Sequence, residues 1–206
     1  MKFSDENEFD MPPSRIIRGL IAAIMVFGLL SAAGCTDDDK DCLPIGRGVI
    51  KRDILAQVNR ERAQGNMCGA EYYPPVHAVS WNEELADAAL RHSMDMAENE
   101  FMDHRGSDGS LPADRMADAG YEPDASGENV GFGNSEEYFG VDSQGAVRWW
   151  MGSPDHCANI MSPAFTEIGA AAVAGGCSGC DCLYWTLDFG FPKNPLIINS
   201  AGSETD

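Results

Sequence analysis

The stretch WWMGSPDHCANIM, residues 149–161, brings Ser153, Asp155, His156 and Cys157 together within five positions. These are the side-chain types found in serine and cysteine hydrolase triads. A serine nucleophile, however, needs a histidine within about 3 Å of its oxygen in space, which sequence neighbours seldom reach. No G-x-S-x-G elbow surrounds the serine either. We therefore expect neither the serine nor the cysteine to act as a nucleophile.

The same stretch is typical of a helix start. Ser153 offers a hydroxyl to cap free backbone N–H groups, Pro154 suits the first helical position, and Asp155 lies near the positive end of the helix dipole. The pattern predicts a helix that begins after Ser153, with the serine oxygen bonded to its own backbone. Only His156 then remains a candidate for function.

The chain has only four histidines, so each can be assessed separately. His77 lies in a proline-rich loop and is expected on the surface. His92 lies on the apolar face of an expected helix, where a hydrogen-bonded core residue is the commoner outcome. His104, in FMDHRGSDG, follows that helix and opens a glycine-containing loop, a position from which an imidazole can face a cleft.

Glu128 is the carboxylate most open to a functional role. In SGENVGFG it follows Gly127, which allows a sharp backbone turn and so presentation of the side chain in a cleft. Two histidines, a glutamate and a water can hold zinc. Alternatively, Glu128 hydrogen-bonds a nearby histidine and braces loops. The residue chemistry leaves both interpretations open.

The N-terminal residues 1–34 are expected to be a lipoprotein-type signal peptide. A basic leader precedes the apolar run Gly19–Leu30, which is too short for a comfortable membrane span. Small residues then precede Cys35, as in a bacterial lipobox, where the cysteine carries lipid. Ala32 stands where a larger aliphatic residue is usual, so ordinary secretion also stays open. We expect the protein to be exported. It is then either held at the bacterial cell envelope, with this lipid anchor as its only membrane attachment, or released to the exterior.

Cysteine usage agrees with export. Seven cysteines less a lipidated Cys35 leave six, an even number that predicts an oxidising compartment and up to three disulfides. A metal site in CSGCDC is less expected, because four-cysteine zinc sites usually have two separated pairs. The disulfide candidates are Cys42, Cys68, Cys157, Cys177, Cys180 and Cys182.

Length and charge limit the remaining possibilities. The 206 residues suit one domain with extensions, which we place as a tether at 35–47, the domain at 48–192 and a polar tail at 193–206. The formal net charge of -19 repels phosphate backbones and anionic lipid surfaces. A nucleic-acid partner is therefore not expected.

These candidates must be positioned by helices followed by strands. Hydrophobic spacing predicts helices at 49–62, 81–101 and 143–152, with a short helical turn around 112–120. Runs of aromatic, branched and small residues predict strands at 165–176 and 183–190, and a shorter one at 127–133. Helices followed by a hairpin indicate an α+β domain with helices packed on an antiparallel sheet.

Taken in order, several stretches from Val49 to Gly190 resemble the CAP superfamily, the cysteine-rich secretory, antigen 5 and pathogenesis-related 1 proteins, and in particular its bacterial SCP-like extracellular branch. The stretches are ILAQVNRERA, WNEELADAALRHSMDMA, FMDHRGSDGS, RMADAGY, GENVGFG, WWMGSPDHCANIM, FTEIGAAAV and YWTLDFG. The resemblance implies a three-layer α-β-α sandwich with a central antiparallel sheet. It also implies a central cleft whose two histidines and two glutamates can bind a divalent metal.

Residue by residue, the resemblance places the first cleft histidine at His104 and the glutamate of the G-E-N signature at Glu128. The second glutamate falls near Ser153 and the second histidine near Ala164, so both are missing. His156 is a candidate to replace a missing group, and Glu167 is another. If a metal such as zinc or calcium binds, His104 and His156 are its expected ligands.

Three functions follow from this reading. The leading one is a secreted, lipid-anchored protein that binds a small ligand, lipid, glycan or envelope component in a cleft lined by His104, Glu128 and His156. The second is a metal-assisted, peptidase-like hydrolase with Glu128 as general base. The third is a disulfide-stapled interaction module with an inert cleft. We expect Cys68 to pair with Cys157, and the CSGCDC cysteines to staple their own hairpin or reach Cys42.

Overall fold

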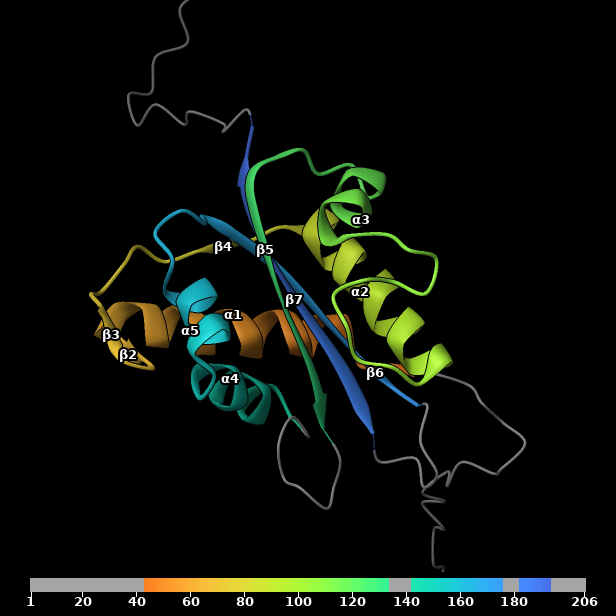
Figure 1. Cartoon of the computed structure of the whole chain (residues 1–206), viewed down its shortest axis with the longest axis horizontal. Helices are drawn as coiled ribbons and strands as arrows, with labels where there is room; N and C mark the ends of the chain where they lie inside the picture. The colour runs from red at the N-terminus through yellow and green to blue at the C-terminus, as the bar shows by residue number, and fades with distance from the viewer. Residues whose placement is uncertain (1–42, 134–141, 176–181, 194–206) are drawn as a thin grey trace, which may run out of the picture. The chain divides into compact units, whose positions relative to one another are not determined.

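The computed structural model describes residues 43–133, 142–175 and 182–193 (Figure 1). The expected signal peptide and the polar tail beyond residue 193 lie outside these ranges, as do Cys35, Cys42, Cys177 and Cys180. No helix within the described ranges is both long and apolar enough to cross a membrane.

Five helices and seven strands make up the described part of the chain. The helices are α1 (Arg47–Gln64), α2 (Glu83–Asn99), α3 (Pro112–Asp118), α4 (Ser143–Met151) and α5 (Pro154–Met161). The strands are β1 (Leu43–Pro44), β2 (Asn66–Cys68), β3 (Glu71–Tyr73), β4 (Ser80–Trp81), β5 (Pro123–Gly133), β6 (Glu167–Ala174) and β7 (Leu183–Pro192).

The main sheet has the strand order β1-β6-β7-β5. The short strand β4, which precedes α2 in the chain, pairs with the start of β6. All neighbours along this order are antiparallel, whereas the two-residue β4 runs parallel to β6. The strand expected at 127–133 is longer than predicted, because β5 runs from Pro123 to Gly133. Strand β5 is last in the strand order and is therefore an edge strand of the sheet.

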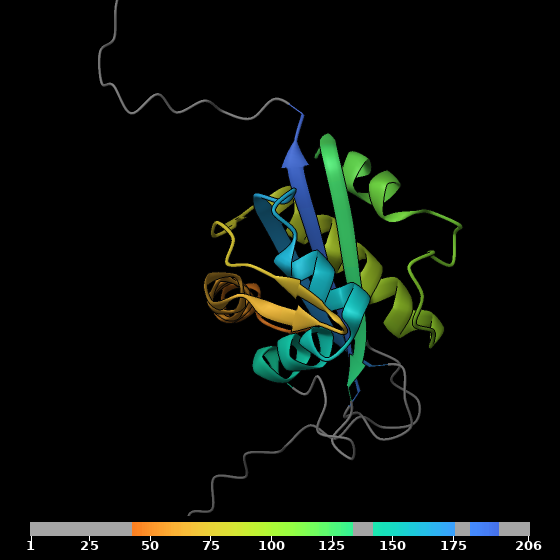
Figure 2. The same ribbon diagram turned by 60° about the vertical axis from the view of Figure 1, so that its left-hand side comes forward.

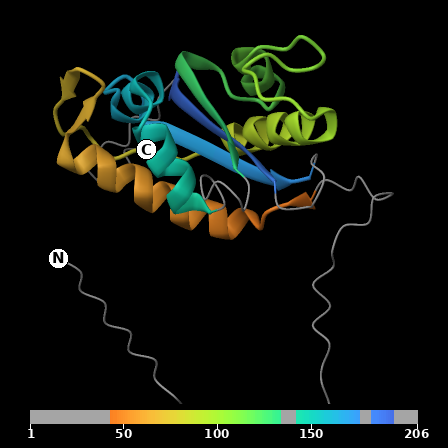
Figure 3. The ribbon, with the colours of Figure 1, turned by 60° about the horizontal axis from the view of Figure 1, so that its bottom comes forward.

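Helices cover both faces of the sheet, which confirms the expected α+β three-layer sandwich (Figures 1 and 3). Alternate strand residues face opposite layers, because successive side chains of a strand point to opposite faces. One face, with Trp185, Leu187 and Phe189 of β7, packs in the core shared with α1, α4 and α5. The other face, with Val173 and Tyr184, packs against α2.

Helix α2 lies unusually close to strand β6. A Cβ added at Gly169 would be 2.1 Å from the backbone nitrogen of Ala86, so only glycine fits between helix and sheet. The helix start is well defined, since Asn82 accepts a hydrogen bond from the backbone N–H of Leu85 and two glutamates follow in the first turn. This contact fixes the helix that carries His92 and leads to His104.

The end of α1 is anchored by a buried arginine that the sequence analysis did not single out. Arg62 is 1% exposed and donates to four backbone carbonyls: those of His77, Ile160, Ser162 and Phe165. Burial lowers the pKa of the guanidinium to about 10. One side chain thus holds the end of α1 against the end of α5 and the entry to β6.

The residues after α1 form a small hairpin, β2–β3, where no strand was predicted. It lies beside α5, to which the expected disulfide between Cys68 and Cys157 ties it (Figure 2). That pairing is confirmed. Cys182 is disulfide-bonded as well.

The predicted helix start at residue 153 is correct in position but not in its capping bond. Ser153 is the N-cap of α5, with Pro154 at the start and Asp155 in the first turn. Its side chain makes no capping hydrogen bond, contrary to expectation. The backbone carbonyl of Ser153 accepts the N–H of Cys157, so the helix begins without the hydroxyl.

Candidate functional site

Glu128 lies in the middle of the edge strand β5, with its side chain on the α2 face of the sheet. That side chain is 1% exposed, so the carboxylate is taken out of water and needs partners. Asn159 of α5 donates to the backbone carbonyl of Glu128 at 3.3 Å, and Trp150 of α4 donates to that of Val130 at 2.9 Å. Helices α4 and α5 of the opposite layer therefore supply hydrogen-bond donors to two backbone carbonyls of β5.

His104 contacts Glu128 directly, as the sequence allowed. Its Nδ1 lies 2.8 Å from Oε1 of Glu128, while its side chain is 51% exposed. The hydrogen bond to Glu128 raises the pKa of the imidazole above its ordinary value, against the smaller opposing effect of burial. The ring is thus fixed from behind and open to solvent in front.

Arg115 of α3 also holds His104 and Glu128 in place. Its Nη2 donates to Oε2 of Glu128 at 2.5 Å and to the backbone carbonyl of His104 at 3.1 Å. Its Nη1 donates to the backbone carbonyl of Ser110 at 3.1 Å. Because Arg115 and Glu128 are both 1% exposed, this is a buried ion pair that also holds both ends of the loop from 104 to 110.

His92 of α2 is a core residue, as the sequence predicted. It is 0% exposed, and its Nε2 lies 2.8 Å from the backbone carbonyl of Asp103, the residue before His104. Burial lowers the pKa of this imidazole, so it is held in the neutral form. We conclude that Nε2 carries the proton and donates it to the carbonyl, which fixes the start of the loop.

His156 comes from the other layer. Helix α5 packs with α1 and α4, and the His156 ring lies against Trp149, with 5.5 Å between the ring centroids. Burial lowers the pKa of this imidazole, and the charge of His104 lowers it further, so the two rings are close enough to interact electrostatically. Its buried Nδ1 has no hydrogen-bond partner among the described residues.

The described residues around Glu128 do not fit a metal centre. Both oxygens of Glu128 are already bonded, one to His104 and one to Arg115. Among the residues that the structure describes, no three His, Cys, Asp or Glu side chains are grouped so as to hold a metal ion. A catalytic zinc usually takes three protein ligands. The pair His104 and His156 is therefore not supported as a metal site.

The other candidates lie elsewhere. Glu167, offered as a replacement ligand, accepts a hydrogen bond from the hydroxyl of Tyr121 at 2.8 Å. Ala164 is exposed and provides no ligating group, and His77 is exposed as expected. Ser153 makes no side-chain capping bond at the start of α5. Of the residues proposed for the cleft, only His104 and Glu128 are bonded to each other within the described ranges, and His156 interacts with His104 only through its charge.

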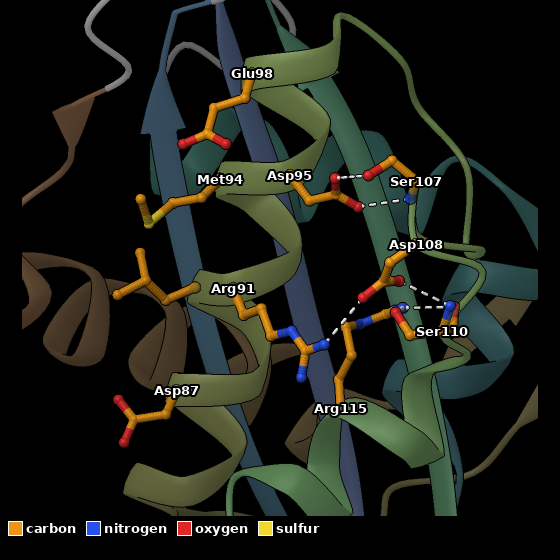
Figure 4. A pocket seen from close by; sticks show the side chains of 10 residues that line it. Asp87, Arg91, Met94, Asp95, Glu98, Ser107, Asp108, Ser110 and Arg115 are labelled. Atoms are coloured by element: carbon orange, nitrogen blue, oxygen red, sulfur yellow. Dashed lines mark hydrogen bonds and ion pairs between the residues drawn. The ribbon is translucent and has the colours of Figure 1, made fainter.

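Two cavities formed by described residues lie away from the expected cleft. The larger, of about 470 Å³, lies over the outward face of α2 and the loop that follows, where Arg91 bonds Asp108 and Asp95 bonds Ser107 (Figure 4). The other, of about 190 Å³, is mostly apolar and lies between the start of α1, α2 and β6. Neither is lined by His104, Glu128 or His156.

Two buried charged residues near Glu128, Arg115 and Asp188, were not singled out from the sequence. Arg115 lies in the short helix PADRMAD, and nothing in that pattern sets it apart from a surface arginine. Asp188 lies opposite Glu128 in the β5–β7 register and is 0% exposed. A charged residue inside the mostly apolar strand YWTLDFG was a usable signal, because acidic residues are almost never fully buried unless they are paired.

Two curated proteins of Bacillus subtilis (strain 168) are similar in sequence. The uncharacterized protein YkwD is 31% identical over 108 residues, covering 52% of this chain and 37% of that protein. The uncharacterized membrane protein YlbC is 26% identical over 111 residues, covering 54% of this chain and 28% of that protein. The chain therefore spans well under half the length of either relative.

Solved structures show the same fold. An extracellular protein of Bacillus anthracis that contains an SCP domain aligns over 70% of this chain and 41% of its own, with TM-score 0.53 and 21% identity. An outer surface protein of Borrelia burgdorferi aligns over 73% of this chain and 98% of its own, with TM-score 0.57 and 15% identity. The family model described as "CAP: Cysteine-rich secretory protein family" matches residues 55–189. The chain therefore belongs to the cysteine-rich secretory protein (CAP) family.

Proposed function

We propose that this protein is an exported CAP-domain protein that binds a small ligand or an envelope component at His104. Glu128 and Arg115 support the imidazole from behind, and His156 flanks it from the other layer. The ligand class that fits is one with an acceptor oxygen, such as a carboxylate, a phosphate or a sugar hydroxyl. An imidazolium whose Nδ1 is held by Glu128 offers its Nε2–H to such a group.

One observation carries this proposal: the buried ion pair of Glu128 and Arg115 holds the exposed ring of His104. Burying two charges costs several kcal/mol each before their attraction is regained, so an ion pair is weak support for stability alone. Here the pair of Glu128 and Arg115 orients an imidazole that is 51% exposed. An orientation maintained at that cost at the surface is typical of a side chain that meets a partner.

The hydrolase alternative has less support. A general base must reach a water on the substrate side. The carboxylate of Glu128 is instead buried and used by His104 and Arg115. Nothing in the described residues favours the inert interaction module over ligand binding either, so we carry one function forward.

Export forms part of the proposal and rests on the N-terminal pattern. The basic leader, the apolar run Gly19–Leu30 and the small residues before Cys35 support a lipoprotein signal. The disulfide between Cys68 and Cys157 supports an oxidising compartment. The relative from Bacillus anthracis is described as extracellular, which points the same way.

The test is a binding screen on the purified domain with lipids, glycans and acidic small molecules. We expect His104→Ala to weaken binding of any hit at least tenfold, because the ring makes the contact. His77→Ala is the matched control, since His77 is an exposed histidine distant in sequence from the site. A hit whose affinity is unchanged in His104→Ala would remove the proposal.

A further inference from the structure

Asp188 is the most completely buried acidic group in the described part of the protein. Its side chain lies on β7, on the same face as Glu128, because Asp188 and Glu128 are direct partners in the antiparallel β5–β7 register. Direct partners have Cβ atoms about 4.5–5.5 Å apart, so the two carboxyl groups are neighbours. Asp188 is 0% exposed, and neither of its oxygens has a hydrogen-bond partner among the described residues.

The buried charges beside Asp188, those of Arg115 and Glu128, balance each other when Asp188 is neutral. The imidazole of His104 is half exposed and bonds Glu128. Arg115 is the one buried cation of the cluster, and Glu128 already takes its Nη2 at 2.5 Å. The imidazole of His92 is 4.0 Å from Glu128, and burial lowers its pKa, so it adds no charge. A second carboxylate beside Glu128 would be an uncompensated buried anion, a state that proteins avoid by protonation.

We propose that Asp188 is a positioning residue for His104: its carboxyl stays protonated and shares its proton with Glu128 across the β5–β7 pair. The neutral acid donates to a Glu128 oxygen, which leaves the carboxylate oriented between His104 and Arg115. No bond is made or broken beyond this hydrogen bond. The arrangement is that of two carboxyl groups holding one proton because both cannot ionise at such short range.

The titratable groups around the pair of Asp188 and Glu128 are consistent with this state. Strand β5 contributes Glu128, and that glutamate is met by Arg115 of α3, by the buried His92 of α2 and by His104 of the following loop. On its other side, Asp188 is opposite Gly169 of β6, which has no side chain. The remaining acid on this face, Glu167, bonds Tyr121 further along the sheet. Burial, and then the charge of Glu128, raise the pKa of the Asp188 carboxyl well above its ordinary value.

The first experiment compares the stability of the wild-type chain with that of Asp188→Asn, by urea unfolding between pH 5 and pH 8. The unfolded aspartate ionises near pH 4, whereas the folded one keeps its proton. Wild type must therefore lose stability relative to the variant as pH rises. We expect the ratio of the two unfolding constants to change by up to tenfold per pH unit.

A matched control and an independent measurement keep the first experiment decisive. Asp124→Asn changes an exposed aspartate of β5, and its ratio to wild type should stay flat with pH. A flat ratio for Asp188→Asn as well would overturn the proposal. Infrared difference spectra of wild type with labelled aspartate should show a protonated carboxyl band at neutral pH. Its absence would have the same consequence, even if the variant failed to fold.

The positioning role has its own readout, the pKa of His104 followed by NMR of its ring protons. Asp188→Asn keeps a donor to Glu128 and should leave this pKa within about 0.3 units of the wild-type value. Asp188→Leu removes the donor, concentrates the carboxylate charge on His104 and should raise it. Equal values in both variants would refute positioning. The role rests on the proposed function of His104, but none of these readouts needs a ligand, so a failed binding screen would leave them intact.

Discussion

His104 and Glu128 act as one unit whose properties come from burial on one side only. The glutamate is 1% exposed and the histidine 51% exposed, with 2.8 Å between the bonded atoms. Such a contact favours the charged imidazole, because the nearby carboxylate stabilises it more than partial burial penalises it. The site therefore presents an oriented imidazole with a raised pKa on a strongly acidic protein.

This pairing predicts the behaviour of Glu128→Gln. The pKa of His104 should fall toward its ordinary value of about 6.5, since the carboxylate that raises it is gone. NMR titration of the ring protons measures this, with His77 as an internal reference. An unchanged His104 pKa would show that the hydrogen bond does not persist in solution.

The same substitution predicts a stability change with a defined dependence on pH. Removing the carboxylate leaves Arg115 buried without its ion-pair partner, which typically costs about 3–5 kcal/mol. In the wild type, the raised pKa of His104 adds stability that is fully present below pH about 6.5 and is lost as pH rises through the folded value. Urea unfolding of both proteins from pH 5 to pH 9 should show this pH-dependent contribution to stability only in the wild type.

At the scale of elements, two close contacts determine where the site residues lie. Gly169 allows α2 to approach β6 so closely that a methyl group would overlap backbone atoms of Leu85 and Ala86. Arg62 bonds carbonyls that belong to the loop before β4, the end of α5 and the entry to β6. Each contact joins layers that are distant in sequence.

Gly169→Ala should therefore destabilise the protein by at least about 1–3 kcal/mol, because the helix must move away from the sheet. Thermal and urea unfolding measure the effect. Gly48→Ala is the matched control: it lies in the first turn of α1, with no atom within 4 Å of an added Cβ. That change should be neutral or slightly stabilising. Equal effects of the two substitutions would contradict the packing argument.

Arg62→Met should cost about 3 kcal/mol or more, although methionine keeps most of the aliphatic stem. Four backbone carbonyl groups, two of them in buried hydrogen bonds, lose their shared donor, and unsatisfied buried polar groups are expensive. Urea unfolding compares this variant with Arg60→Met, which removes a neighbouring, exposed arginine from the same helix. Similar losses in both would show that the carbonyl contacts matter little.

At the scale of the whole domain, a disulfide links two segments that the sheet does not join. Cys68 follows α1 in the β2–β3 hairpin, and Cys157 lies 89 residues later in α5. Closing a loop of that length restricts the unfolded chain. The covalent link and Arg62 both act on the layer formed by α1, α4 and α5, so this layer is secured twice.

Replacing both cysteines, Cys68→Ala with Cys157→Ala, should lower the free energy of unfolding by about 2–4 kcal/mol. The His104 pKa should stay unchanged, because the disulfide lies on the face of the sheet opposite Glu128. Unfolding midpoints and NMR titration test the two statements together. Unchanged stability, or a shifted His104 pKa, would contradict this division of the molecule.

The sequence by itself determined the helices, the three principal strands and the α+β class, and the family resemblance placed His104 and Glu128 in one cleft. Hydrophobic periodicity is a local property, and the glutamate and histidine were expected to meet through a recurring family pattern. It also suggested the pairing of Cys68 with Cys157. It left the β2–β3 hairpin, the capping of Ser153 and the place of Glu167 wrong or undetermined.

Only the tertiary structure decided which groups surround Glu128. Strand alternation places Glu128 and Asp188 on the α2 face, whereas His156 arrives with α5 on the other, and no pattern of single residues shows this. Arg115 reaches the glutamate from a helix whose sequence is unremarkable. The physical reason is that burial and charge balance depend on which layers meet, and these are sums over contacts distant in sequence.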